Sequence, residues 1–175
     1  MEDQLILIDL FDREIGYGPK LEVHRRGQLH RAFSVFLIDG DRMLIQQRNP
    51  EKYHSGGLWA NACCSHPRKG EKLEEAVVRR MEEELGIRTE CKELFHFVYY
   101  SKYSDEMHEY ELDHVFLGNY HGDPSFSREE IAQVKWVSME WLAEDLKNHP
   151  EQYASWFQIA APSVLEKVWS DGRNR

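Results

Sequence analysis

The feature that most constrains the fold is a single well-patterned helix set between two β-rich halves of the chain. Across residues 71–85 the apolar side chains recur at helical spacing, and Gly86 follows at a C-cap position. Strand-like apolar runs lie on both sides, at residues 29–38, 43–45, 59–64, 94–103, 109–120 and 135–137. A helix with one apolar face must be buried against other elements, so we expect an α+β fold in which helices pack against sheets.

The segments between and after these runs add detail to the expected order. Asp39-Gly40-Asp41 separates two apolar runs and predicts a β-hairpin. Ser138 predicts the N-cap of a helix that continues to about residue 147, and a last helix is expected from near residue 151 or 154. No repeat, low-complexity tract or linker divides the chain, so we expect residues 1–175 to form one domain.

Composition excludes several classes of partner. The 22 Lys and Arg against 31 Asp and Glu give a net charge of −9, which argues against non-specific nucleic-acid binding. The apolar runs are too short to cross a bilayer, and the acidic start does not resemble a signal peptide. Of three cysteines, Cys63 and Cys64 are adjacent and poorly placed for a structural bridge. We therefore expect a reduced cytoplasmic protein that acts on a small molecule.

Two charged residues fall on the apolar side of the predicted helix. Arg80 and Glu84 lie inside the arc of apolar side chains on the helical wheel. Such a pair is usually a surface ion pair. Here it lies beside Arg79 and within the acidic run 82–84, and this crowding suggests a site for a hard cation and a phosphate.

The predicted strand over residues 109–120 carries a similar anomaly. Strand alternation places Glu109, Glu111 and Asp113 on one face. A row of acids is usually a solvated face, but these carboxylates repel one another and a bound metal ion would offset that repulsion.

Three histidines are further candidates for metal ligands, although any one of them is more often a surface or hydrogen-bonded residue. His24 and His30 flank the entry to the first hairpin, and His66 follows Cys64 by two residues. Together with two carboxylates they would complete a nitrogen and oxygen ligand set for Zn²⁺ or Mn²⁺. Spacing alone does not show that they converge.

Residues 65–87 resemble a Nudix box, G-x5-E-x7-R-E-U-x-E-E-x-G-U, in which U is apolar. The matching residues are Glu71, Arg79, Met81, Glu83, Glu84, Gly86 and Ile87. Ser65 replaces the opening Gly, and Arg80 replaces the Glu that follows the Arg. In Nudix hydrolases this second position helps to hold the hydrolytic metal, so the resemblance argues against ordinary pyrophosphate hydrolysis.

A more specific resemblance covers nearly the whole chain. The pattern Asn61-x-x-Cys64-x-His66-Pro67 and the segments 29–34, 47–48, 57–61, 79–80, 83–86 and 109–111 are similar to the type 1 isopentenyl-diphosphate Δ-isomerases. The resemblance implies a Nudix-like α/β/α sandwich of mixed β-sheets with flanking helices. It also implies interconversion of isopentenyl and dimethylallyl diphosphate, by protonation and deprotonation through a tertiary carbocation, in isoprenoid precursor biosynthesis.

The resemblance assigns the catalytic groups residue by residue. Cys64 matches the catalytic cysteine and Glu111 the catalytic carboxylate on the opposite face of the substrate. Tyr99 matches the tyrosine that supports this carboxylate, with neighbouring Tyr100 as the alternative. Trp156 matches the tryptophan that faces the hydrocarbon end.

The resemblance also implies two metal ions and a basic anion site. One divalent ion, Mn²⁺, Zn²⁺ or Mg²⁺, would be held by His24, His30, His66, Glu109 and Glu111. A Mg²⁺ that arrives with the substrate diphosphate would be held by Glu84 and a backbone oxygen of Cys64. The diphosphate itself would be bound by Lys20, Arg48, Lys52 and Arg80.

Two rival interpretations remain at this point. The first is a Nudix pyrophosphohydrolase of a small diphosphate, against which Arg80 and the Cys64 signature speak. The second is a non-enzymatic Nudix module, which should lack several of the polar positions that this chain retains. The expected partner is a small diphosphate, with neither nucleic acid nor membrane, and the expected state is a monomer or a weak homodimer.

Overall fold

Strand β3 (His30–Asp39) runs through the middle of a mixed sheet in the computed structural model, which describes residues 3–52 and 54–173. Strand β8 (Met107–Asn119) is its parallel neighbour, with His30 directly opposite Glu111. The short strand β6 (Cys63–Ser65) pairs antiparallel with β3 and places Cys64 opposite Ser34. Segments far apart in the sequence thus bring an imidazole, a carboxylate and a thiol to neighbouring positions.

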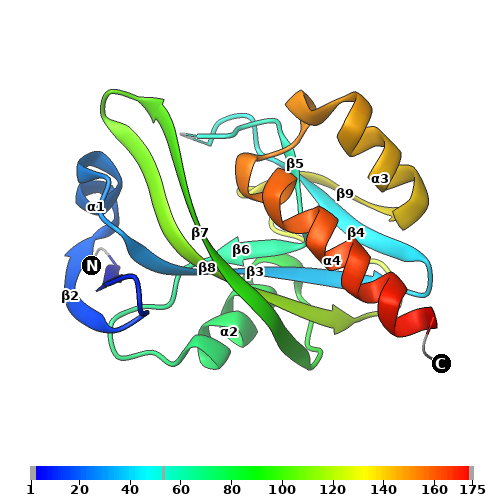
Figure 1. Cartoon of the computed structure of the whole chain (residues 1–175), viewed down its shortest axis with the longest axis horizontal. Helices are drawn as coiled ribbons and strands as arrows, with labels where there is room; N and C mark the ends of the chain where they lie inside the picture. Colours follow the sequence, from blue (N-terminus) through cyan, green and yellow to red (C-terminus); the bar gives the residue numbers. More distant parts are fainter. Residues whose placement is uncertain (1–2, 53, 174–175) are drawn as a thin grey trace.

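The remaining strands extend this sheet on both sides. The expected hairpin is confirmed, since Asp39 of β3 pairs with Arg42 of β4. Strand β7 lies antiparallel on β8, and the two form the long hairpin that stands out from the body in Figure 1. The bounds of these strands are Gln4–Ile8 for β1, Glu14–Pro19 for β2, Arg42–Arg48 for β4, Trp59–Ala60 for β5, Cys91–Ser104 for β7 and Ile131–Ser138 for β9.

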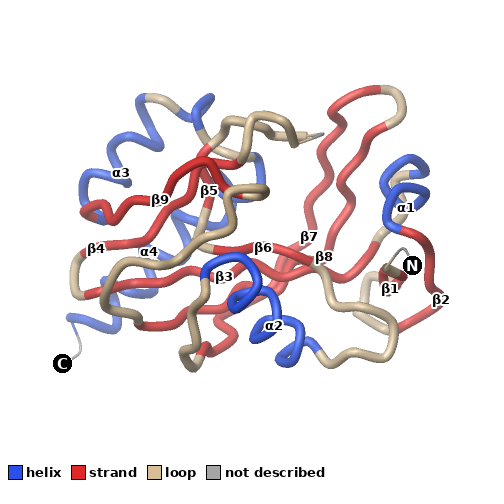
Figure 2. Tube along the Cα trace, turned by 180° about the vertical axis from the view of Figure 1, so that it is seen from behind, coloured by secondary structure: helices blue, strands red, loops and turns tan. Residues whose placement is uncertain are grey.

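Helices cover both faces of the sheet. Helix α4 (Ser155–Arg173) crosses the front in Figure 1, and helix α2 (Leu73–Leu85) lies on the face that Figure 2 shows from behind. Helix α3 (Met139–Asn148) packs on the same core as α4, whereas α2 packs on a separate apolar cluster. The expected α+β sandwich, a mixed sheet with flanking helices, is confirmed. No helix within the described ranges is both long and apolar enough to cross a membrane.

Helix boundaries differ from the sequence expectation in two places. Helix α2 begins at Leu73 rather than at Glu71, because Glu71 pairs with Arg79 and accepts the backbone N–H of Arg68. Gly86 is left-handed, with φ 63°, as its predicted C-cap role requires. The last helix begins at residue 155, after a 3₁₀ turn over Pro150–Gln152.

Residues 4–26 form a unit in which no element was expected from the sequence. Strands β1 and β2 pair antiparallel, and helix α1 (Lys20–Arg26) follows β2 directly. This helix packs against β8 and places His24 in the interior. His24, which is far in sequence from the other predicted ligands, therefore reaches the interior because α1 packs against β8.

Candidate active site

One cavity of about 310 Å³ collects most of the predicted site residues. It opens where α1, β3, β6, β8 and the start of α4 meet. The predicted residues in its wall are Lys20, Arg48, Lys52, Cys64, His66, Arg80, Glu84, Tyr99, Glu109, Glu111 and Trp156. His24 and His30 are fully buried behind that wall.

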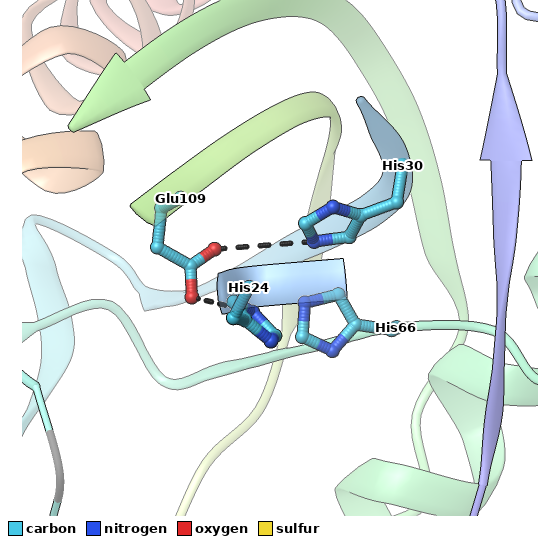
Figure 3. Close-up of side chains that lie close together, drawn as sticks. All are labelled: His24, His30, His66 and Glu109. Atoms are coloured by element: carbon cyan, nitrogen blue, oxygen red, sulfur yellow. Dashed lines mark ion pairs between the residues drawn. The ribbon is translucent and has the colours of Figure 1, made fainter. Parts of the chain in front are cut away.

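Three imidazoles and a carboxylate converge beside the cavity (Figure 3). The ligand atoms of His24, His30, His66 and Glu109 all lie within 4.8 Å of one another. His24 Nε2 is 2.8 Å from Glu109 Oε1, and the His30 and His66 rings are centred 5.0 Å apart. Elements α1, β3 and β8 and the residue after β6 contribute one side chain each. The structure therefore brings together the three histidines, which their spacing in the sequence alone could not show.

Backbone carbonyls orient two of these imidazoles. His24 Nδ1 donates to the Lys20 carbonyl at 2.7 Å, and His30 Nδ1 donates to the Gln28 carbonyl at 2.9 Å. We assign the proton to Nδ1 in each ring because a carbonyl can only accept. Nε2 is then the nitrogen that faces the carboxylates, which is the arrangement that metal-ligating histidines use.

Glu111 lies between two histidines and a tyrosine. Its Oε2 is 3.1 Å from His30 Nε2 and 2.7 Å from His66 Nε2, and the Tyr99 hydroxyl donates to its Oε1. Tyr100 instead is 55% exposed and contacts His108. Of the two candidate tyrosines, Tyr99 is therefore the one that contacts the carboxylate.

Burial and ion pairing fix the charges of these groups. Burial alone would raise the pKa of Glu111, but the hydrogen bonds from His30 and His66 hold that pKa well below its ordinary value. Burial lowers the pKa of His66 to about 4, so its ring is neutral at pH 7. Burial also raises the pKa of Tyr99 far above its ordinary value, which keeps its hydroxyl proton in place. The site thus presents a neutral His66 ring beside an ionised Glu111, whereas the hydrogen bond to Glu111 raises the pKa of His30 above its ordinary value against the effect of burial.

The residues fit a divalent transition-metal ion. Zn²⁺ and Mn²⁺ both accept imidazole nitrogen together with carboxylate oxygen. Glu109 Oε2 is buried and makes no hydrogen bond with a described residue, although His54 and His24 contact the other oxygen of this carboxylate. A cation among these groups would offset the repulsion between Glu109 and Glu111.

The two adjacent cysteines occupy different environments. Cys63 is fully buried in the apolar cluster beneath α2, whereas Cys64 faces the cavity. Burial raises the pKa of the Cys64 thiol to about 12, against a smaller lowering by Arg48. The Cys64 sulfur therefore carries its proton at pH 7 in the metal-free protein.

The basic residues of the cavity are partly engaged by acids of the protein. Arg80 lies 2.6 Å from Glu83, 2.6 Å from Glu84 and 2.5 Å from Glu130. Lys52 lies 3.8 Å from Glu130. Burial, together with Glu130, raises the pKa of Glu84 to about 7. This corner holds the acid pair Glu83 and Glu84 against Arg80, and Lys52 joins the group through Glu130.

His54, Asn61, Asp113 and Glu130 also belong to the site, although no role there was expected for them from the sequence. His54, Asp113 and Glu130 line the cavity, and Asn61 is buried behind it. Asp113 shares the strand face of Glu109 and Glu111, so alternation already pointed to it. The other three lie on loops and a short extended run, where no periodic signal marks the direction of a side chain.

Comparison with known families matches residues 28–158 to the NUDIX domain. Among curated proteins, the chain is 44% identical to "Isopentenyl-diphosphate Delta-isomerase 2" of Aromatoleum aromaticum, over 94% of this chain and 88% of that protein. It is 46% identical to "Isopentenyl-diphosphate Delta-isomerase 1" of the same organism, over 94% of each chain. A relative of the same description from Photobacterium profundum is 41% identical, over 96% of this chain and 95% of its own.

Solved structures agree on the fold. The crystal structure of DR0079 from Deinococcus radiodurans superposes with a TM-score of 0.76 at 19% identity, over 92% of this chain and 98% of that one. A MutT NUDIX hydrolase from Burkholderia pseudomallei superposes with a TM-score of 0.63 at 21% identity, over 78% of this chain and 98% of that one. At these identities the likeness concerns the fold alone.

Proposed function

Since this chain belongs to the Nudix-fold isopentenyl-diphosphate Delta-isomerases, we propose that the cavity lined by Cys64 and Glu111 interconverts isopentenyl and dimethylallyl diphosphate, with these two residues as the proton-transferring pair. The observation that carries this assignment is that one cavity wall holds a partly buried thiol and a buried carboxylate together with a set of basic residues. An alkene shift needs two proton-transfer groups and an anchor for the diphosphate.

In this reaction the substrate gains one proton at one carbon and loses one proton from another. In the forward direction the terminal alkene carbon takes a proton from Glu111, which leaves a tertiary cation. Cys64 then removes a proton two carbons away, and the new double bond forms from the electrons of that C–H bond. In the reverse direction the two groups exchange roles. The metal-free protein holds the proton on Cys64 and the negative charge on Glu111, which is the state that the forward step leaves behind.

Tyr99 and Trp156 support this transfer. The Tyr99 hydroxyl holds one oxygen of Glu111, so the other oxygen has a fixed direction. Trp156 is 3% exposed and lies in the cavity wall, where its π face would stabilise the developing cation and its bulk would exclude water.

The diphosphate is anchored by the basic residues. Lys20, Arg48, Lys52 and Arg80 line the cavity, and charge-assisted hydrogen bonds to phosphate oxygens are strong and directional. Arg80 and Lys52 already contact Glu130. These contacts hold their side chains in place before the substrate enters, which lowers the entropy lost on binding.

Two divalent ions belong to the proposal. His24, His30, His66, Glu109 and Glu111 would hold one, and Glu84 with the Cys64 carbonyl would hold a Mg²⁺ that enters with the diphosphate. When bound, the ions supply positive charge that tunes the carboxyl group and neutralises the phosphates. The enzyme would work in the cytoplasm as a monomer or a weak homodimer.

Proton exchange with solvent is the direct test. Incubation of isopentenyl diphosphate in heavy water should introduce deuterium into both isomers, and Cys64→Ala and Glu111→Gln should each abolish this uptake. A Nudix pyrophosphohydrolase would instead release phosphate from nucleoside diphosphates. Phosphate release without deuterium uptake would overturn the proposal in favour of hydrolysis.

A further inference from the structure

A second cluster of metal-ligating side chains lies outside the cavity. The ligand atoms of Glu93, His96 and His114 all lie within 4.8 Å of one another. None of the three lines the cavity. His114 follows Asp113 on β8, and because neighbouring residues of a strand face opposite sides, it lies on the face of the sheet away from Glu111.

Strand irregularity brings the three side chains to one face. His96 and His114 are directly opposite on β7 and β8. Glu93 is three residues before His96, so a regular strand would place the two on opposite faces. The register shifts between Glu93 and Phe95, which adds one residue to β7 and returns Glu93 to the face of His96. The cluster therefore depends on a bulge in an otherwise regular hairpin.

The buried member of the cluster is oriented by a carboxylate behind it. His114 is 6% exposed, and its Nε2 lies 2.9 Å from Asp12 Oδ2. Arg31 holds Asp12 through its Nε at 2.7 Å and through a second nitrogen on the Asp12 carbonyl at 2.7 Å. We assign a proton to Nε2 because Asp12 accepts it, so Nδ1 is the nitrogen turned toward Glu93.

We propose that Glu93, His96 and His114 form a second divalent transition-metal site, with Zn²⁺ as the fitting ion. Two imidazoles and one carboxylate are a frequent zinc ligand set, with a fourth position open to water. The Glu93 side chain is 41% exposed and His96 is exposed, so an ion can enter from solvent. Asp12 accepts a hydrogen bond from the other ring nitrogen of His114, as carboxylates commonly do for metal-bound histidines.

An ion at this site would join two segments of the chain. Asp12 belongs to the turn between β1 and β2, so a metal on His114 would couple that turn to the β7–β8 hairpin. Asp12 has a φ of 62°, a conformation that costs energy for a residue with a side chain. The competing explanation is a network without metal, in which His114 bridges Asp12 and Glu93 through its two ring nitrogens.

Metal counting on the full-length enzyme separates the two explanations. After equilibration with Zn²⁺ and removal of loosely bound ion, the wild type should hold one Zn²⁺ more per chain than His96→Ala or Glu93→Gln. Added Zn²⁺ should raise the Tm of the wild type more than that of these two variants. Both substituted residues are solvent-exposed, so the variants should fold and keep their isomerase activity.

A matched control is available in His121, an exposed histidine 2.7 Å from Asp39 that lies outside the cluster. His121→Ala should keep the wild-type zinc count. Asp12→Asn should keep the site but weaken zinc binding by about 10–100-fold, because it removes the orienting carboxylate. If the wild type and His96→Ala hold equal zinc, and His30→Ala removes all tightly bound ion, the cluster is an ion-pair network and the proposal is wrong.

Discussion

The indole Nε1–H of Trp156 donates a hydrogen bond to Oδ1 of Asn61 at 3.0 Å. The amide of Asn61 in turn donates to the carbonyls of Val35 at 3.0 Å and Cys63 at 2.7 Å. All of these groups are buried. The first turn of α4 is thereby tied to the segment that carries Cys64, and the indole ring is held in the cavity wall.

This relationship sharpens the expected effect of substitutions at Trp156. A desolvated cation–π contact contributes about 2 kcal/mol or more, so Trp156→Leu should lower kcat by about 30-fold or greater. Trp156→Phe keeps a π face and should keep substantial activity. Steady-state rates on isopentenyl diphosphate give the comparison.

Stability provides the control for these two variants. Each leaves Asn61 Oδ1 without its donor, at a cost of about 1–3 kcal/mol in the free energy of unfolding. Urea titrations should therefore show similar losses for Phe and Leu. Equal kcat values in folded Phe and Leu variants would show that Trp156 only packs.

Cys64 and Cys63 should respond differently to the same substitution. Cys64→Ala should abolish isomerisation and leave the thermal transition nearly unchanged, because the thiol borders a cavity. Cys63→Ala removes a fully buried sulfur and should lower the Tm while much of the activity remains. Activity and Tm measured on both variants check this, and the reverse pattern would place the catalytic thiol one residue earlier.

The metal ligands should divide into two functional groups. His30→Ala should lose the ion held by protein alone, because His30 contacts both Glu109 and Glu111. Glu84→Gln should keep that ion and raise the Mg²⁺ concentration required for activity. Elemental analysis and Mg²⁺ titration of the rate distinguish them. Fully active enzyme without a tightly bound metal would contradict the first expectation.

Glu84 should also set a pH dependence of stability in the metal-free protein. Its pKa is raised from 4.5 to about 7 by burial, so the folded chain keeps a proton that the unfolded chain releases. This contribution is complete below pH 4.5 and is lost as the pH rises through 7. Glu84→Gln mimics the protonated form, so it should stabilise the protein at pH 8 by up to about 3 kcal/mol, and little at pH 4.5.

Urea unfolding in the presence of a chelator measures this difference at the two pH values. The amide side chain of the Glu84→Gln variant can still accept a hydrogen bond from Arg80, so the wild type and this variant differ mainly in the charge at this position. A variant no more stable than the wild type at pH 8 would show that the ion pair with Arg80 outweighs burial of the carboxylate.

Elements with a local pattern could be predicted from the order of the residues alone. Helix α2 and its Gly86 cap, the turn at Gly40 and the shared face of Glu109 and Glu111 follow from periodicity and turn chemistry, which neighbouring residues decide. The signature around Cys64 was also readable, since its residues are close in the chain.

Which of these residues come into contact depends on the folding of the whole chain. The pairing of His30 with Glu111 joins strands far apart in the sequence, and local propensity carries no information about such a register. The entry of His24 depends on helix α1, which packs against β8, and the turn of Glu93 toward His96 depends on one extra residue in β7. Long-range packing and strand register are properties of the whole fold, so the assembly of both metal-ligand clusters lay beyond the sequence pattern.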